Sequence, residues 1–145
     1  MNQSKRVFLI DDDEDDRLFF GIGLNEYDPS IEFIYDKDSE IALRRLSEKM
    51  QPLPDIVFLD WNMPKLSGRQ ILGAIRANGR FDEVPVIIFT TSSSTQDKEE
   101  AAELGASFFL SKPASLYELK KNLEDIFNLV WEDKLLPHQH HLPRI

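Results

Sequence analysis

The chain has 145 residues, of which 41% are hydrophobic and 30% are charged, with a formal net charge of −9 and no cysteine. This length suits one domain that buries roughly 68% of the surface exposed by its unfolded chain, and the lack of cysteine excludes disulfides. The acidic balance argues against direct nucleic-acid binding, while apolar runs of 4 to 6 residues without a signal-peptide core argue against membrane insertion or export, so we expect a cytoplasmic protein.

Five short apolar runs alternate with longer amphipathic segments along the chain. The runs are rich in β-branched and aromatic residues and predict strands at 6–10, 31–35, 55–59, 84–89 and 107–110. The segments between them predict helices at about 14–26, 38–49, 68–78, 95–104 and from Ser115, as N-cap, to Trp131. Gly105 takes the usual C-cap place after the fourth helix. Such alternation favours an α/β fold, a doubly wound five-stranded parallel sheet with helices on both faces and right-handed crossovers.

Polar side chains follow four of the predicted strands, at the point where each strand ends. The first strand runs straight into six acidic residues, Asp11 to Asp16, and the third ends at Asp60. The fourth strand ends at Thr90, and Lys112 follows the fifth. Parallel strands bring their carboxyl ends to one edge of the sheet, where open α/β sheets place ligand sites. Acids held together there raise one another's pKa, so the site needs a divalent cation or Lys112.

These positions resemble the receiver domain of two-component response regulators. The resemblance rests on Asp11-Asp12, Asp60, Thr90 and Lys112 in that order, on Asp-x-x-Met-Pro-x-x-x-Gly from Asp60 to Gly68, and on Lys112-Pro113. It covers nearly the whole chain and implies the flavodoxin-like (βα)5 fold with strand order 2-1-3-4-5, whose switch point lies between the first and third strands. We expect a receiver domain at residues 1–131 and a C-terminal tail at residues 132–145, with no output domain.

The resemblance also implies a phosphoacceptor and a metal site. Asp60 takes the place of the aspartate that accepts a phosphoryl group, and acts as the nucleophile. Mg²⁺ prefers oxygen ligands, and the resemblance assigns it Asp12, Asp60 and the backbone carbonyl of Asn62, with Asp11 acting through water.

The fourth and fifth predicted strands supply the rest of the implied catalytic set. Lys112 neutralises the acyl phosphate, and the Lys112–Pro113 peptide bond is cis in the family. Thr90 is the switch hydroxyl that hydrogen-bonds a phosphoryl oxygen. Phe109 is the switch aromatic, and because phenylalanine has no polar tip we expect it to favour burial.

Other charged residues have alternative interpretations. Asp13 could strengthen the field at the metal site or begin the following helix, whose first turn favours negative charge. Asp15 and Asp16 are expected to be solvated acids of that turn. The tail histidines suggest a metal or phosphorelay site, but a solvated tail is the interpretation we favour; they are His138, His140 and His141.

The function implied by the resemblance is that of a stand-alone receiver, a phosphoacceptor signalling domain and not an enzyme with a separate substrate. A histidine kinase or phosphotransfer protein gives its phosphoryl group to Asp60 with Mg²⁺. The switch at Thr90 and Phe109 then reshapes a surface around the fourth helix, fifth strand and fifth helix, which binds a downstream protein.

Two other classes compete with this function. A phosphatase of the haloacid dehalogenase type needs a second aspartate two residues after the nucleophile, where this chain has Asn62. A phosphorylation-independent binding scaffold on a receiver fold usually lacks an acid or the lysine, and this chain retains them.

The C-terminal segment carries a narrower resemblance. The helix from Ser115 to Trp131, followed by residues 132–137, is similar to single-domain regulators that pair with phytochrome-like kinases, in which this segment supports a homodimer. Apolar residues expected to be exposed suggest a contact surface there, or a tail that folds back on its own domain; they are Leu129, Trp131, Leu135 and Leu136.

Overall fold

The sheet has the strand order that the resemblance implies. The structure, a computed structural model, describes residues 5–48 and 50–131. Five strands form one parallel sheet in the order β2-β1-β3-β4-β5: β1 (Arg6–Ile10), β2 (Glu32–Asp36), β3 (Ile56–Leu59), β4 (Val86–Thr90) and β5 (Phe108–Ser111). Every residue of β3 and β4 is buried, because helices cover both faces of a parallel sheet, and this is why these strands read as continuous apolar runs.

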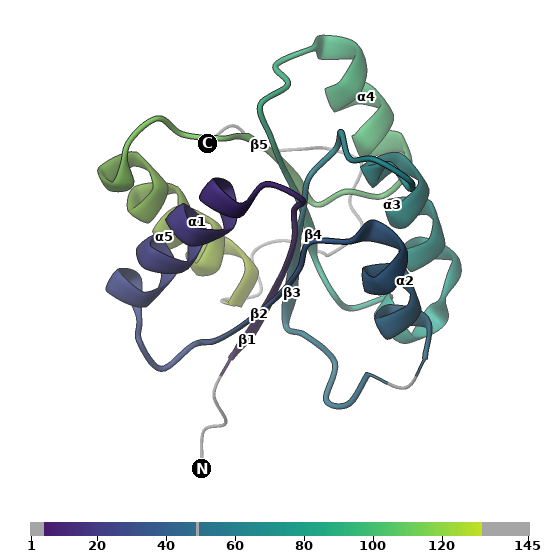
Figure 1. The fold of residues 1–145 in the computed structure, drawn as a ribbon, viewed down its shortest axis with the longest axis horizontal. Coiled ribbons are helices and arrows are strands. Elements are labelled where there is room, and N and C mark those ends of the chain that lie inside the picture. The colour runs from purple at the N-terminus through teal and green to yellow at the C-terminus, as the bar shows by residue number, and fades with distance from the viewer. Residues whose placement is uncertain (1–4, 49, 132–145) are drawn as a thin grey trace.

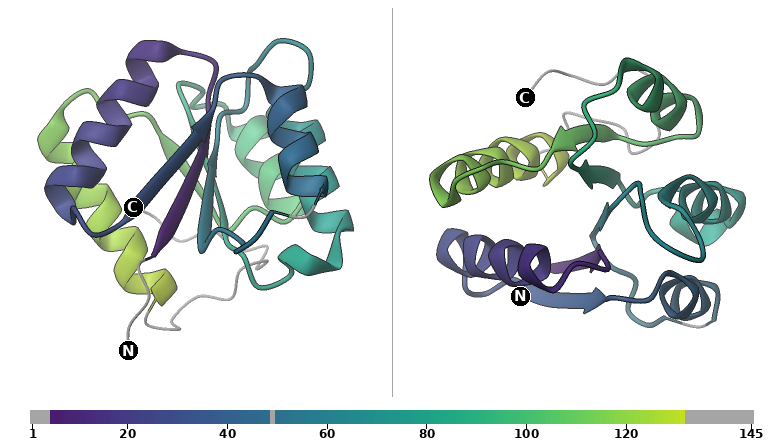
Figure 2. Two further views of the ribbon diagram at one scale, coloured as in Figure 1. Left: turned by 60° about the horizontal axis from the view of Figure 1, so that its bottom comes forward. Right: turned by 45° about the horizontal axis from the view of Figure 1, so that its top comes forward.

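Helices form a layer on each side of the sheet (Figures 1 and 2). One layer holds α1 (Glu14–Tyr27) and α5 (Leu116–Trp131), and the other holds α2 (Ser39–Ser47), α3 (Gly68–Ala77) and α4 (Thr95–Glu103). A short 3-10 helix, η1 (Gly79–Phe81), follows α3 and was not predicted. Within the described ranges, no helix combines the length and hydropathy that crossing a membrane requires.

Two predicted helix boundaries are confirmed by their capping contacts. Ser115 Oγ accepts a hydrogen bond from the backbone N–H of Glu118 at 3.1 Å. After α4, the backbone N–H of Ala106 donates to the carbonyl oxygen of Ala101 at 2.9 Å, and Gly105 between them has a φ of 103°. This is a Schellman ending, whose left-handed residue favours glycine.

The two faces of the sheet bury separate apolar clusters. Side chains alternate along each strand, so Phe8 packs toward α2, α3 and α4, and Phe58 packs toward α1 and α5. The ring centroid of Phe58 lies 4.8 Å from Phe20, 6.2 Å from Phe89 and 6.3 Å from Phe127, all edge-to-face. Such ring pairs stabilise the core beyond the area that they bury.

The strand register brings the carboxyl ends of four strands to one level. Ile10 pairs with Leu59, and Leu59 pairs with Ile88. Thr90, two residues beyond Ile88, pairs with Ser111 of β5. The residues that follow these pairs therefore leave the sheet at one edge, where the predicted site residues lie.

The end of α5 is more buried than we expected from the sequence. Leu129 and Trp131 are partly buried against the cluster between the sheet and α5, and the Trp131 ring stacks on Phe127 with centroids 4.3 Å apart. The expectation that these two residues are exposed is therefore wrong, while Leu135, Leu136 and the tail histidines lie outside the described residues. Among described residues, the large exposed apolar side chains are Leu18, Ile22, Tyr35, Ile41 and Tyr117.

Truncating the aromatic centre of the core tests this packing. Phe58 is fully buried, and we expect Phe58→Ala to lower the free energy of unfolding in urea by about 3–5 kcal/mol because it leaves a cavity. Tyr117→Ala is the control, because Tyr117 is 76% exposed, and its effect should stay within about 0.5 kcal/mol. A loss at Phe58 no larger than that of the control would contradict the packing described.

Candidate functional site

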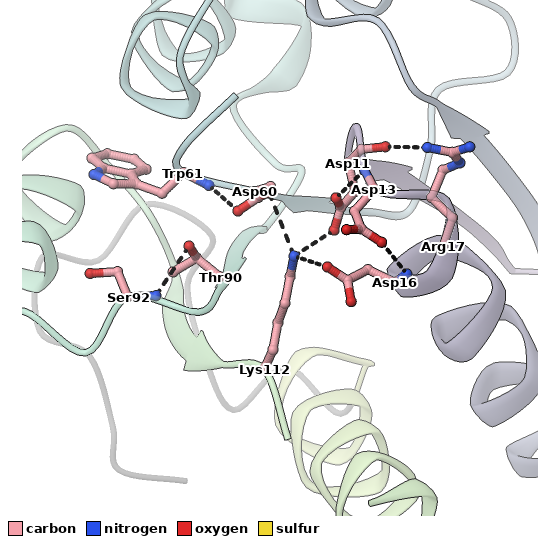
Figure 3. A network of polar contacts seen from close by, with 9 residues as sticks. All are labelled: Asp11, Asp13, Asp16, Arg17, Asp60, Trp61, Thr90, Ser92 and Lys112. Atoms are coloured by element: carbon pink, nitrogen blue, oxygen red, sulfur yellow. Dashed lines mark hydrogen bonds and ion pairs between the residues drawn. The ribbon is translucent and has the colours of Figure 1, made fainter. Parts of the chain in front are cut away.

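Two buried carboxylates lie next to each other where β1 and β3 end. Asp11 is fully buried and Asp60 is 6% exposed, whereas Asp12 is exposed. The sheet fixes their backbones, because the N–H of Asp60 donates to the carbonyl of Ile10 at 3.0 Å and that of Asp11 donates to Asp36 at 3.1 Å. Figure 3 shows both carboxylates near the tip of a lysine side chain. The structure thus brings together the acids that the sequence analysis singled out.

Lys112 supplies positive charge between these acids. Its Nζ lies 2.9 Å from Asp11 Oδ2, 3.5 Å from Asp60 Oδ2 and 2.6 Å from Asp16 Oδ2 (Figure 3). Its backbone N–H donates to the carbonyl of Thr90 at 2.7 Å, which ties it to β4. Burial by itself lowers the pKa of the Lys112 ammonium, but the hydrogen bonds to the carboxylates raise that pKa above its ordinary value. The lysine is therefore positively charged at neutral pH.

Asp11 has an incomplete set of partners. Its Oδ1 accepts a hydrogen bond from the backbone N–H of Asp13 at 3.0 Å. Its Oδ2 is buried and has no aligned hydrogen bond among the described residues, although Lys112 Nζ stands 2.9 Å away. Burial raises the pKa of Asp11 to about 6, against the opposing effects of the Asp13 N–H and Lys112. A buried oxygen left in this state is suited to a further cation.

Asp60 has one fixed oxygen and one that faces the lysine. Its Oδ1 accepts a hydrogen bond from the backbone N–H of Trp61 at 2.8 Å. Burial raises the pKa of Asp60 above its ordinary value, although Lys112, the Thr90 hydroxyl and the Trp61 N–H all lower it. The nearby charge of Asp12 raises the same pKa further.

Thr90 connects Asp60 to the start of α4. It is fully buried at the end of β4, and its hydroxyl is close enough to Asp60 to lower the pKa of that carboxyl. Thr90 Oγ1 also accepts from the backbone N–H of Ser92 at 3.4 Å (Figure 3). Ser92 Oγ in turn donates to Asp97 Oδ2 of α4 at 2.6 Å. A series of polar contacts therefore leads from the carboxylate to the helix.

The acids at this edge fit a divalent cation. Oxygens of Asp11, Asp12 and Asp60 lie within 4.8 Å of one another. Mg²⁺ prefers carboxylate oxygens. Burial raises the pKa values of Asp11 and Asp60, and Asp11 also has a buried oxygen without an aligned hydrogen bond, which a cation would relieve. Asn62 is exposed two residues after Asp60, and its carbonyl as a fourth ligand stays a prediction.

The start of α1 takes part in the site through Asp16, which the sequence analysis expected to be solvated. Asp16 is not a solvated acid of the helix turn, because it pairs with Lys112. Arg17 Nη1 donates to the carbonyl of Asp11 at 3.0 Å. Asp13 is the N-cap of α1 and accepts the N–H of Asp16 at 2.9 Å. The sequence held a signal for this contact. If Asp13 is taken as the N-cap, Asp16 falls at a defined position in the first turn, and the direction of its side chain follows.

Two expectations at β5 concern the burial of Phe109 and the peptide bond after Lys112. Phe109 is partly buried against the cluster that faces α2, α3 and α4, and Lys98 Nζ lies 5.9 Å from its ring centroid. The expected cis Lys112–Pro113 bond is wrong, because the cis peptide bond among the described residues is Gln51–Pro52. Lys112 reaches the acids with a trans bond, held by its backbone contact with β4.

Comparisons of the sequence with known proteins identify one family. The family model of the response regulator receiver domain matches residues 7–124. Response regulator Rcp1 of Synechocystis sp. is 29% identical over 140 residues, which cover 94% of this chain and 95% of Rcp1. The probable methanogenesis regulatory protein FilR2 of Methanothrix harundinacea is 34% identical over 97 residues, which cover 66% of this chain and 63% of FilR2.

Solved structures extend the likeness to the fold. The phosphorylated cyanobacterial phytochrome response regulator RcpA has a TM-score of 0.78 at 26% identity and covers 92% of this chain and 99% of its own. The Mn²⁺-bound form of Rcp1 has a TM-score of 0.76 at 27% identity and covers 97% of this chain and 99% of its own.

Gly68 lies where the start of α3 comes close to the backbone of Asp60 and Trp61, and a substitution there tests this close approach. The N–H of Gly68 donates to the carbonyl of Trp61 at 2.9 Å, and a Cβ there would overlap the carbonyl oxygen of Asp60. We expect Gly68→Ala to displace the start of α3 and lower the free energy of unfolding in urea by about 1–3 kcal/mol. Gly73→Ala, with open space in the same helix, should instead stabilise by up to about 1 kcal/mol. Equal stabilities of the two variants would rule out the close approach.

Asp11 gives the site a pH dependence with a defined sign. Its pKa is about 6, against an ordinary 3.8, so the folded protein binds this proton more tightly than the unfolded chain does. The ionised carboxylate therefore destabilises the fold above about pH 6, and this effect disappears as the pH falls toward about 4. In metal-free buffer, we expect the stability of Asp11→Asn relative to wild type to fall by about 1 kcal/mol from pH 7 to pH 5. Urea unfolding measures this, and a constant or rising difference would contradict it.

Proposed function

The chain belongs to the response regulator receiver family, and on that basis we propose that it accepts a phosphoryl group on Asp60. One observation carries the proposal: Asp60 Oδ1 is fixed by the Trp61 N–H, while Oδ2 faces Lys112 Nζ at 3.5 Å, beside two further acids able to hold a metal. Phosphoryl transfer to a carboxylate needs an oxygen nucleophile in a fixed place and positive charge for the transferred group.

The donor in this proposal is a phosphohistidine of a histidine kinase or a phosphotransfer protein. Receiver domains are phosphoacceptor signalling domains that work with such proteins and with downstream targets. An ionised oxygen of Asp60 attacks the phosphorus in line, and the phosphorus–nitrogen bond breaks. The electron pair stays on the imidazole, which leaves after taking up a proton, and the product is an aspartyl phosphate. Lys112 keeps its proton and pairs with the charge on the phosphoryl oxygens.

Asp11, Asp12 and Asp60 would hold Mg²⁺, together with the carbonyl of Asn62. The arrangement of the three carboxylates supports this assignment, as does the Mn²⁺-bound form of Rcp1 among the similar structures. When bound, the cation neutralises charge on the phosphoryl oxygens. The acids contribute its position, because the sheet holds two of them at adjacent strand ends.

Thr90 and Phe109 would carry the change away from Asp60. The buried Thr90 hydroxyl is close enough to bond Asp60 and would turn to a phosphoryl oxygen. Phe109 lies on the neighbouring strand, partly buried and next to Lys98 of α4. A shift of this ring would alter the surface formed by α4, β5 and α5, which we assign to a downstream protein.

The partner assignment follows the relatives. We propose a stand-alone regulator, with a receiver domain at residues 1–131 and a tail at residues 132–145; the match over 94% of this chain and 95% of Rcp1 supports this. RcpA is a phytochrome response regulator, and a phytochrome-like kinase is the phosphoryl donor that we propose here. A homodimer through the C-terminal helix region and a cytoplasmic location belong to the same proposal.

Acetyl phosphate offers a test that needs no kinase. We expect wild-type protein to gain the mass of one phosphoryl group with Mg²⁺ and none without it, read by intact mass. Trp61 adjoins Asp60, so its fluorescence should change with Mg²⁺ and with phosphorylation. The chain has 2 tryptophans, and a Trp131→Phe background leaves Trp61 as the only tryptophan.

Two matched variants identify the acceptor. Asp60→Asn should gain no phosphoryl group, because it has lost the nucleophilic oxygen. Asp36→Asn should gain it as wild type does, because Asp36 also ends a strand but its carboxylate pairs with Arg45 of α2 at 2.7 Å, and only its backbone contacts Asp11. Phosphorylation of Asp60→Asn would exclude Asp60 as the acceptor. A wild type that takes no phosphoryl group from any donor would leave a phosphorylation-independent binding scaffold.

A further inference from the structure

The carboxylate nearest to the Lys112 ammonium belongs to Asp16, which is neither the acceptor nor a metal ligand. Nζ lies 2.6 Å from Asp16 Oδ2, against 2.9 Å from Asp11 Oδ2 and 3.5 Å from Asp60 Oδ2. The contact with Asp16 also has hydrogen-bond alignment. Figure 3 shows Asp16 reaching from the start of α1 to the lysine tip.

The start of α1 holds Asp16 in this place. Its backbone N–H donates to Asp13 Oδ1 at 2.9 Å, in the N-cap contact. The next residue, Arg17, donates from Nη1 to the carbonyl of Asp11 at 3.0 Å. These two bonds fix the first turn of the helix against the end of β1, so the carboxylate of Asp16 is presented to the lysine.

The length of the contact between Lys112 and Asp60 is what needs explaining. An ammonium group has three N–H donors, and a charge-assisted bond to a carboxylate closes to about 2.8 Å. Asp60 Oδ2 is buried and faces the ammonium, yet Nζ stays at 3.5 Å, beyond the usual range of such bonds. The ammonium is drawn toward the α1 side, where Asp16 takes the shortest contact.

We propose that Asp16 is a positioning residue that holds Lys112 back from Asp60. The inference rests on the proposed phosphoryl acceptance at Asp60. With the ammonium held on the α1 side, Asp60 Oδ2 stays open to Mg²⁺ and to the incoming phosphoryl group. Lys112 remains near enough to pair with a phosphoryl oxygen once that group has arrived.

Loss of Asp16 should change the Mg²⁺ requirement and not the maximal rate. Without this partner Lys112 moves onto Asp60 and competes with the cation for the same oxygen. We expect Asp16→Asn to raise the Mg²⁺ concentration for half-maximal phosphorylation roughly three- to tenfold, about 0.7–1.4 kcal/mol. At saturating Mg²⁺ the competition is overcome, and the rate should return to within about twofold of wild type.

Asp15→Asn is the matched control for this experiment. Asp15 lies in the same helical turn and is exposed, and its variant loses the same charge one position away. Phosphorylation by acetyl phosphate is measured against Mg²⁺ concentration in both variants. If both variants raise the Mg²⁺ requirement equally, the effect comes from the lost charge and not from the contact with Lys112, and the proposal is overturned. A loss in Asp16→Asn that saturating Mg²⁺ does not recover would also overturn it, because that is the result of a damaged fold.

A structural measurement separates this proposal from the function on which it rests. Crystal structures of metal-free wild type and Asp16→Asn need neither a phosphodonor nor a cation. The distance from Lys112 Nζ to Asp60 Oδ2 should shorten from 3.5 Å to about 2.8 Å in the variant. An unchanged distance overturns the positioning role even if Asp60 is phosphorylated. A shortened distance supports that role even if no donor phosphorylates Asp60.

Discussion

The structure depends on one ammonium group shared by buried carboxylates. Asp11 and Asp60 occupy neighbouring strand ends, and a buried charge is costly unless an opposite charge or a hydrogen bond compensates it. Lys112 provides that compensation from the other side of the sheet, which is possible because all the strands are parallel and β5 therefore ends at the same edge as β1 and β3. The apolar clusters on both faces fix the register in which these charges meet.

One lysine does not balance the negative charge at this edge, because Lys112 contacts three carboxylates and a fourth lies beside them. Asp11, Asp12, Asp16 and Asp60 all lie at this edge, and the pKa values of Asp11 and Asp60 are raised above their ordinary range. A pocket with this excess of negative charge is less stable alone than with a bound cation. The same excess of negative charge attracts a cation. The arrangement that lowers the stability of the metal-free protein is therefore also the one that binds a metal.

Most of the fold and of the site was open to prediction from sequence, because the signals are local. Strand-length apolar runs gave the five strands, and polar residues at their ends gave the acids, Thr90 and Lys112. The errors concern contacts between distant segments. Asp16 meets Lys112, 96 positions later in the chain, and Trp131 is partly covered by Lys5, whose Nζ lies 5.4 Å from its ring. The Lys112–Pro113 bond is trans, which is the common state, since about 5–6% of X–Pro bonds in folded proteins are cis; the expectation of a cis bond came from the resemblance alone.

Lys112 is also the last part of the site to be synthesised. It lies 96 positions after Asp16 in the chain, and every strand pairing in the sheet is parallel and joins distant segments. In a growing chain the acids of β1 and β3 are therefore present before the cation that balances them. The strand that buries Phe108 and Leu110 also leads directly to the lysine that relieves the repulsion between these acids. The pairing of β5 with β4 thus has an electrostatic contribution besides the apolar one, which helps to offset the entropic cost of a non-local contact.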